Sequence, residues 1–340
     1  MKLSKKKVFA LALAVCLIAT LSMGTLAWFT DQDSVKNDFY IAGSEDGDKD
    51  KIFSVDVWED KDGDGDPDDD IVGDEEGLKY DRIQPGDVLT KIAHVKNTGL
   101  YDQYIRVKIT VSHANIWQEA YGANLIPVTE FVNGLDMDAI YGITTQLDAA
   151  ANEFVYYLYF KAVLPHTTNN DMTVFESVNI CEHLTREQAA TLKNEFNIKV
   201  TADAIQTANV GTNVYEAFET VGMATPLNTV EVADTSALNE ALEAEKEFIV
   251  LTDDIDMHSN KVAGKSAELY LNHFTLETPA GVFAGEYGIA MEGDLTISGH
   301  GNLEVYALKV QVKGAFVNKG AAILNPERIV DVNGDPVVLP

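Results

Sequence analysis

Five aspartates alternate with other residues near the start of the chain, and this spacing suits a hard cation. They are Asp60, Asp62, Asp64, Asp66 and Asp68. Interleaved glycines let the backbone turn sharply, so that several carboxylates can surround an ion with six to eight oxygen ligands, as calcium requires. The loop departs from an EF-hand because its twelfth position is Ile71 rather than glutamate. We expect a calcium site here; a solvated acidic loop without an ion is the alternative.

Catalytic motifs are absent from the sequence. The chain contains neither His-Glu-x-x-His nor Gly-x-Ser-x-Gly, and we assign no catalytic residue. The seven histidines occur singly, and the adjacent Glu182 and His183 are interpreted as a surface pair without a metal. Cys181 is interpreted as a buried structural thiol rather than a nucleophile. We therefore expect a protein that is not an enzyme.

The charge balance excludes one large class of partners. The 340 residues include 54 acidic and only 25 basic side chains, for a net charge of −29. A nucleic-acid binder needs a basic face to neutralise phosphates, so we expect no nucleic-acid partner. The hydrophobic content of 46% is enough to build a sizeable core, and the length suggests about two domains.

The first 27 residues have the pattern of a secretory signal peptide. Four lysines precede an apolar run over residues 8–21, and small residues lead to a cleavage site between Ala27 and Trp28. A transmembrane anchor is the alternative, because the apolar stretch is about long enough to span a bilayer. Cleavage would remove four lysines and no acidic residue, changing the net charge from −29 to −33. We expect an extracellular protein.

Short strands separated by turn signals recur from residue 83 to about residue 221. In residues 105–112 the apolar side chains alternate with polar ones, and residues 154–164 are apolar on both faces, as in a central strand. Residues 196–204 alternate again, and Thr185 with Gln188 forms a capping box that can open a helix. This pattern predicts an all-β fold built on an antiparallel sandwich.

The pattern changes near residue 226. Asp234 can cap a helix with apolar positions at Leu238, Ala241 and Leu242, and brief apolar strands punctuated by Gly or Asn follow it. Their loosely regular spacing favours a short β-solenoid-like domain, with a second small sandwich as the alternative. The strands are expected at residues 248–251, 269–271, 295–297, 303–305 and 310–312.

Several segments together resemble the TasA/camelysin family of biofilm matrix proteins, which a SipW-type signal peptidase processes in Gram-positive bacteria. The resemblance covers residues 20–210 and rests on GTLAWFTD at 24–31, IQPGDVLTK at 83–91, VKNTG at 95–99, FESV at 175–178 and IKVTADAIQ at 198–206. It implies a jelly-roll-like sandwich and a protein that assembles into fibres at the cell surface or in the biofilm matrix. The Asp-rich insert is not part of this resemblance.

The resemblance also implies a mechanism in which the freed N-terminal segment adds as a strand to the next subunit. The chain would then be its own partner in a head-to-tail polymer. The donor segment would cover residues 28–42, with its main side chains being Trp28, Phe29, Val35, Phe39 and Ile41.

The C-terminal region lies outside that family. LYLN at residues 269–272 and LTISGHG at residues 295–301 resemble rungs of secreted pectate-lyase-like solenoids. We see no compact aspartate cluster with a basic partner, so lyase chemistry is not carried over.

These observations divide the chain into four segments. They are a signal peptide at 1–27, a donor-strand segment at 28–47, a TasA-like jelly-roll domain at 48–225 with an Asp-rich insert at 60–70, and a short β-helix-like domain at 226–340.

We expect a secreted structural protein that forms fibres, with other matrix proteins or glycan as further partners. Two alternatives stay open: a monomeric secreted module that binds glycan or a cell-wall partner, and a camelysin-like metallopeptidase. The second lacks the zinc motif that its chemistry needs.

Overall fold

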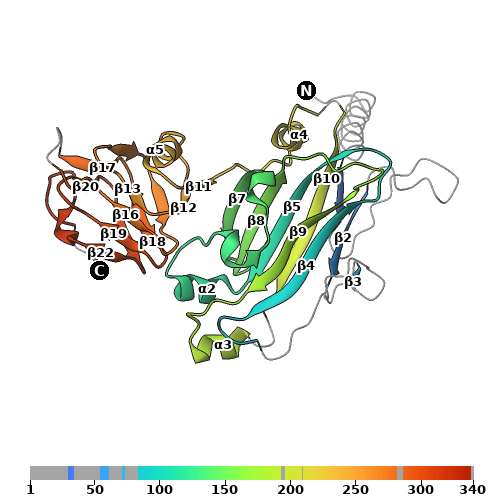
Figure 1. Ribbon diagram of the computed structural model, residues 1–340, viewed down its shortest axis with the longest axis horizontal. Helices are drawn as coiled ribbons and strands as arrows, with labels where there is room; N and C mark the ends of the chain where they lie inside the picture. Colours follow the sequence, from blue (N-terminus) through green and yellow to red (C-terminus); the bar gives the residue numbers. More distant parts are fainter. Residues whose placement is uncertain are drawn as a thin grey trace, which may run out of the picture.

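The chain folds mainly into β-strands, in antiparallel and in parallel sheets, with several short helices. Figure 1 shows the antiparallel strands, coloured blue to yellow, beside the parallel strands in orange and red. The computed structural model describes residues 30–33, 54–60, 71–72, 83–192, 196–208, 210–281 and 286–337.

Two sets of antiparallel strands share one hydrophobic core. The first set, in spatial order, is β1 (Thr30–Asp33), β10 (Ile198–Gln206), β5 (Gln103–Ser112), β8 (Glu153–Phe160) and β7 (Ile140–Asp148). The second set is β3 (Ile71–Val72), β2 (Val55–Asp60), β4 (Val88–Asn97), β9 (Asp171–Asn179) and β6 (Val132–Asn133).

Hydrophobic periodicity explains the central strands. Alternate residues of β5 face the core, and Ile105, Val107, Ile109 and Val111 are fully buried, as the alternation predicts. The strand β8 lies between β5 and β7 and is buried on both faces. Its second face is covered in part by α4 (Val214–Thr220), whose Phe218 packs edge-on against Tyr159. The expected central strand is confirmed, although it ends at Phe160.

Helices correct the all-β expectation. They are α2 (Ala114–Tyr121), α3 (Arg186–Leu192), α4, α5 (Thr235–Glu243) and the 3-10 turns η1 (Val128–Glu130), η2 (Met137–Ala139) and η3 (Pro326–Arg328). The capping box before α3 is confirmed, since the Thr185 hydroxyl accepts from the Gln188 N–H at 3.3 Å and the Gln188 side chain accepts from the Thr185 N–H at 2.8 Å.

Strand pairing changes from antiparallel to parallel at β11 (Thr229–Val232). The remaining strands form three parallel rows. The first row is β12 (Phe248–Leu251), β15 (Ala267–Tyr270), β18 (Leu295–Ser298) and β21 (Phe316–Lys319), and the second is β13 (Ile255–Asp256), β16 (Thr275–Glu277), β19 (Asn302–Glu304) and β22 (Ala322–Leu324). The third row is β14 (Val262–Gly264), β17 (Tyr287–Met291), β20 (Lys309–Val312) and β23 (Ile329–Val330). The chain visits the three rows in turn, so it coils through four three-strand turns. All five strands expected in this region are present.

The coil has a hydrophobic core of its own, and α5 covers its first turn. The Asp234 side chain caps this helix by accepting from the Ala237 N–H at 2.8 Å. The three apolar positions expected on its inner face, Leu238, Ala241 and Leu242, are all buried in that core. Burying these side chains shields the start of the parallel stack from water.

A short seam joins the antiparallel and parallel strands into one ten-stranded sheet. Thr229 of β11 pairs with Ile143 of β7. The Asn228 amide extends this pairing, because it accepts from the Thr145 N–H and donates to the Thr145 carbonyl, each at 2.9 Å. An amide side chain that bonds both backbone groups of a residue mimics the pairing of a further strand residue.

We predict that Glu231→Gln stabilises the protein at neutral pH. Glu231 lies half-buried in β11, and burial raises the pKa of its carboxyl. The native state therefore holds this proton to higher pH than the unfolded chain, so the residue destabilises the fold once the pH exceeds its unfolded pKa of about 4.3. Urea unfolding between pH 4 and pH 7 should show an advantage of the variant that grows with pH; a constant difference would contradict the assignment.

Candidate functional site

Strand β10 is the first candidate site, because a short strand from the N-terminal segment pairs along its outer side. Residues Thr30 to Asp33 of β1 pair antiparallel with Ile205 to Ala202 of β10. The other side of β10 pairs with β5, so β1 completes this edge of the sheet. The predicted donor residues Trp28, Phe29, Val35, Phe39 and Ile41 lie outside the described residues, as does the cleavage site at Ala27.

A buried ion pair lies under this edge. Arg106 of β5 and Asp203 of β10 are cross-strand partners, and the Arg106 Nε atom donates to Asp203 Oδ2 at 2.9 Å. The guanidinium lies 4.7 Å from the ring centre of Tyr157 and 4.8 Å from that of Phe218. Asp203 Oδ1 is buried without a hydrogen-bond partner among the described residues. In the pairing of β1 with β10, Gln32 is the residue opposite Asp203. Strand β10 thus combines backbone pairing along its outer side with a buried ion pair.

The predicted calcium loop is described only at its first residue. Asp60 ends β2, pairs with Ile92 of β4 and is buried. The other four expected ligands, Asp62, Asp64, Asp66 and Asp68, lie outside the described residues. The calcium site stays a prediction.

Two of the segments that carry the family resemblance, residues 83–91 and 95–99, contain turns with structural roles. In the Gln84–Asp87 turn, the Asp87 carboxylate accepts from the Gln84 N–H at 2.7 Å, and Gly86 has a φ of 85°. The buried Asn97 side chain donates to the carbonyls of Tyr101 and Leu164, each at 2.9 Å, and accepts from the Gly99 N–H at 2.9 Å. These hydrogen bonds fix the conformation of the two loops.

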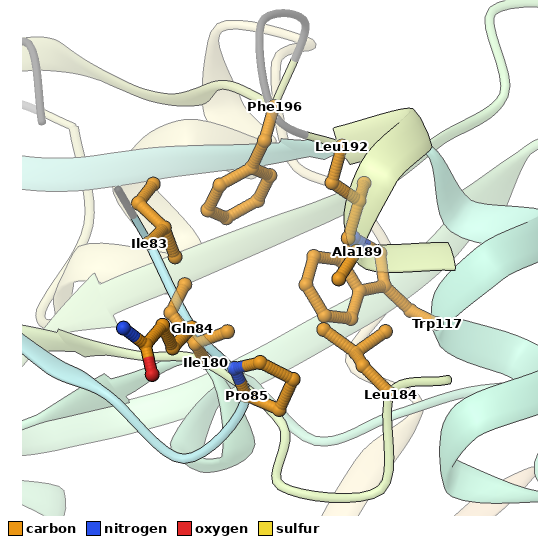
Figure 2. Close-up of a pocket in the computed structure, with 9 residues that line it drawn as sticks. All are labelled: Ile83, Gln84, Pro85, Trp117, Ile180, Leu184, Ala189, Leu192 and Phe196. Carbon is orange, nitrogen blue, oxygen red and sulfur yellow. The ribbon is translucent and has the colours of Figure 1, made fainter. Parts of the chain in front are cut away.

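A small apolar cavity lies beside α2 and α3, next to the core of the antiparallel strands. Figure 2 shows Trp117, Leu184, Leu192 and Phe196 around the gap, with Ile83 opposite. Its free volume is about 20 Å³, which holds about one water molecule. The cavity is too small for an organic ligand.

A larger open groove lies over β5, β7 and β8, beside Asn228. Its volume is about 640 Å³, and its lining includes Lys108, Gln146, Tyr157, Asn228 and Glu247. Hydrogen-bonding side chains around one aromatic ring suit a polar ligand such as a sugar.

The segment between α2 and β6 contacts the parallel coil directly. Glu268 of β15 accepts from the Asn124 N–H at 3.0 Å, and Tyr270 donates to Glu130 Oε1 at 3.0 Å. Phe248, Val250 and Tyr270 of the coil belong to the core of the antiparallel sheets. Burial raises the pKa of Glu130, although the hydrogen bond from Tyr270 opposes this shift. A polar and an apolar contact therefore fix the coil against the antiparallel strands.

Sequence reasoning missed a cluster at the same junction. His183 follows β9, whereas His273 and His300 belong to the coil, and the three rings are neighbours. Nothing in the spacing of single histidines signals this convergence. The nearby Cys181 is buried, as expected, and burial raises the pKa of its thiol.

Comparison with protein-family models, with curated proteins and with solved structures finds no match for this chain. Within the part of the chain that the structure describes, no helix has the length and apolar character needed to cross a membrane.

We predict that Asp203→Ala destabilises the protein strongly. The substitution leaves the Arg106 charge buried beside aromatic rings without its carboxylate, and breaking a buried pair in this way costs about 3–5 kcal/mol. The free energy of unfolding, measured in urea, should fall accordingly.

The matched control is Glu292→Ala, which breaks the exposed ion pair between Glu292 and Lys313. Exposed pairs contribute about 0–1 kcal/mol. Equal losses in the two variants would contradict the role assigned to the buried pair.

Proposed function

We propose that this chain is a secreted structural protein that forms fibres at the cell surface or in a biofilm matrix. The observation that carries this proposal is β1, a four-residue strand from the N-terminal segment that completes the β10 edge. In finer terms, we propose a jelly-roll-like sandwich followed by a short β-solenoid. The resemblance of several sequence segments, in order, to TasA/camelysin proteins supports the same proposal.

The position of β1 makes it suited to exchange between copies. If the leader ends at Ala27, the strand begins at the third residue of the processed chain, so no long N-terminal segment has to move with it. A second copy can offer the same four residues to β10, because the backbone groups and the register are identical. Each copy would then donate at one place and accept at another, and such contacts continue into a filament instead of closing.

Removal of the leader would control this assembly. Before cleavage, residues 28–42 continue directly from the apolar leader, so a SipW-type signal peptidase would set the strand free. Further partners proposed for the assembled fibre are other matrix proteins and glycan.

We predict that deleting residues 28–42 leaves a folded monomer that no longer polymerises. The deletion removes β1 and leaves the rest of the antiparallel core in place. Negative-stain electron microscopy of the processed protein should show filaments for the intact mature chain and none for the deletion variant. Normal filaments from the variant would refute the donor-strand mechanism.

A disulfide trap distinguishes exchange between copies from pairing within one copy. Asp31 pairs with Ala204, and paired Cα atoms in antiparallel strands lie about 4.5–5.5 Å apart, within the range of a disulfide. One protein carries Asp31→Cys and the other Ala204→Cys, so only an exchanged strand can cross-link them. Lys199→Cys in place of Ala204→Cys is the control, because it lies about 17 Å further along β10.

We also propose that calcium orders the Asp-rich loop. Calcium should raise the melting temperature of the processed protein, and Asp62→Asn combined with Asp64→Asn should abolish that rise by removing two carboxylate ligands. The exposed Asp138→Asn is the control. A melting curve that is the same with calcium and with chelator would reject the site.

A monomeric binding module is the second candidate function. The 640 Å³ groove beside Tyr157 and Asn228 favours it, since its polar lining suits glycan. The electron microscopy above separates the two candidates: a processed protein that stays monomeric under all conditions supports the module.

A further inference from the structure

The buried carboxylate of Asp203 has hydrogen bonds at one of its two oxygens. Oδ2 accepts from the Nε and Nη2 atoms of Arg106, and the bond from Nε measures 2.9 Å. Oδ1 has no partner among the described residues, although the Asp203 side chain is only 2% exposed. A carboxylate oxygen removed from water without a donor is costly, so a group that brings a donor to Oδ1 binds more tightly beside it.

The neighbours of Asp203 show from which side a donor can reach it. On the β5 side, the Nη1 atom of Arg106 donates to the Met223 carbonyl and to the Tyr159 hydroxyl rather than to Asp203. Along β10, the next residue on the same face is Ile205, which belongs to an apolar cluster under α4. The remaining side of β10 is the one that β1 covers, and Gln32 is the residue opposite Asp203 there.

The pairing of β1 with β10 therefore places an amide residue beside a buried acceptor. Residues opposite each other in an antiparallel pair belong to the same face of the sheet. The amide of glutamine has two N–H donors. We propose that β10 accepts a strand with a hydrogen-bond donor opposite Asp203, and that Gln32 supplies this donor when the N-terminal segment of a second copy docks. The exchange between copies rests on the proposed function, whereas the requirement for a donor does not.

The residues that flank Gln32 make the same acceptor select the register. Asp31 and Asp33 precede and follow it in β1. A slip of one residue would put one of these carboxylates opposite Asp203, where two like charges would meet beside a buried group. A slip of two residues would bring a threonine or a serine, whose hydroxyl is carried on a shorter side chain. Asp203 thus favours the observed pairing over its neighbouring registers.

This selection adds what backbone pairing alone lacks. The N–H and C=O groups of an open edge accept any extended segment, because every segment offers the same backbone groups. A buried acceptor discriminates against segments that leave it unpaired, and it rejects an acidic residue at the paired position. The partner that fits is therefore a strand with an amide or another donor at this position, as in the N-terminal segment of this chain.

The test measures how often β1 leaves β10, by amide hydrogen exchange of the β10 backbone in the full processed chain. Gln32→Met keeps the length of the side chain and removes the donor, and Gln32→Glu keeps its shape and adds a carboxylate. Leaving Asp203 Oδ1 unpaired should speed exchange of the β10 amides on the β1 side by about tenfold or more. The rates should rise from the parent to Gln32→Met and again to Gln32→Glu, where like charges meet.

Thr30→Val is the matched control. Thr30 belongs to the same face of β1 and lies opposite Ile205, which needs no donor. This variant should exchange at the rate of the parent. Because methionine adds apolar surface, a role of Gln32 in packing alone would leave exchange unchanged or slow it in Gln32→Met.

Filament formation in the same samples separates this inference from the proposed function. The protein concentration needed for filaments should rise in the same order as the exchange rates. The inference is overturned if Gln32→Met and Gln32→Glu, shown by circular dichroism to be folded, exchange and assemble as the parent does. A parent that forms no filaments while the exchange rates keep the expected order would reject the fibre and support the role of Gln32.

Discussion

The seam between β7 and β11 joins the antiparallel strands to the parallel coil. Two sheet systems with opposite pairing rules meet there through Thr229 and the Asn228 amide. Because β11 is antiparallel to β7 and parallel to β12, this one strand fixes the direction of every later strand in its row. The coil contributes Phe248, Val250 and Tyr270 to the core of the antiparallel sheets.

The strongly acidic composition bears on the proposed assembly. If the leader is removed as proposed, each copy would carry a net charge of −33, and salt and bound cations would weaken the repulsion between copies. The contact proposed between copies is made by backbone groups of β1 and β10, which carry no net charge. The Arg106 charge beneath that edge is paired with the Asp203 carboxylate, so these two buried groups add no net charge to the contact.

Much of the fold could be predicted from local patterns, because strands with alternating burial and helices with side-chain caps leave signals in consecutive residues. β5 and α5 are such cases. The helix α2 escaped prediction because it starts after His113, which has a left-handed backbone and makes no side-chain cap. The strict all-β class was wrong because the fold also contains helices, two of which, α3 and α5, the side-chain caps predict.

The candidate sites were less accessible to sequence reasoning. Arg106 and Asp203 are 97 positions apart, and only strand register brings them together. The histidines likewise meet through the stacking of coil turns and the placement of a distant loop. Such convergence depends on tertiary structure, which single-residue types and local spacing do not encode. The residues of the proposed calcium loop and donor strand, by contrast, are predicted from sequence, and most of them lie outside the described residues.

The helix α5 covers the first turn of the parallel coil and packs on β11 and β14. Whole turns could therefore be gained or lost further along the coil without disturbing α5 or the joint to the antiparallel strands. Length becomes a variable that natural selection can adjust in steps of one turn. Proteins of this architecture would then differ in the length of the coil while keeping the same first turn.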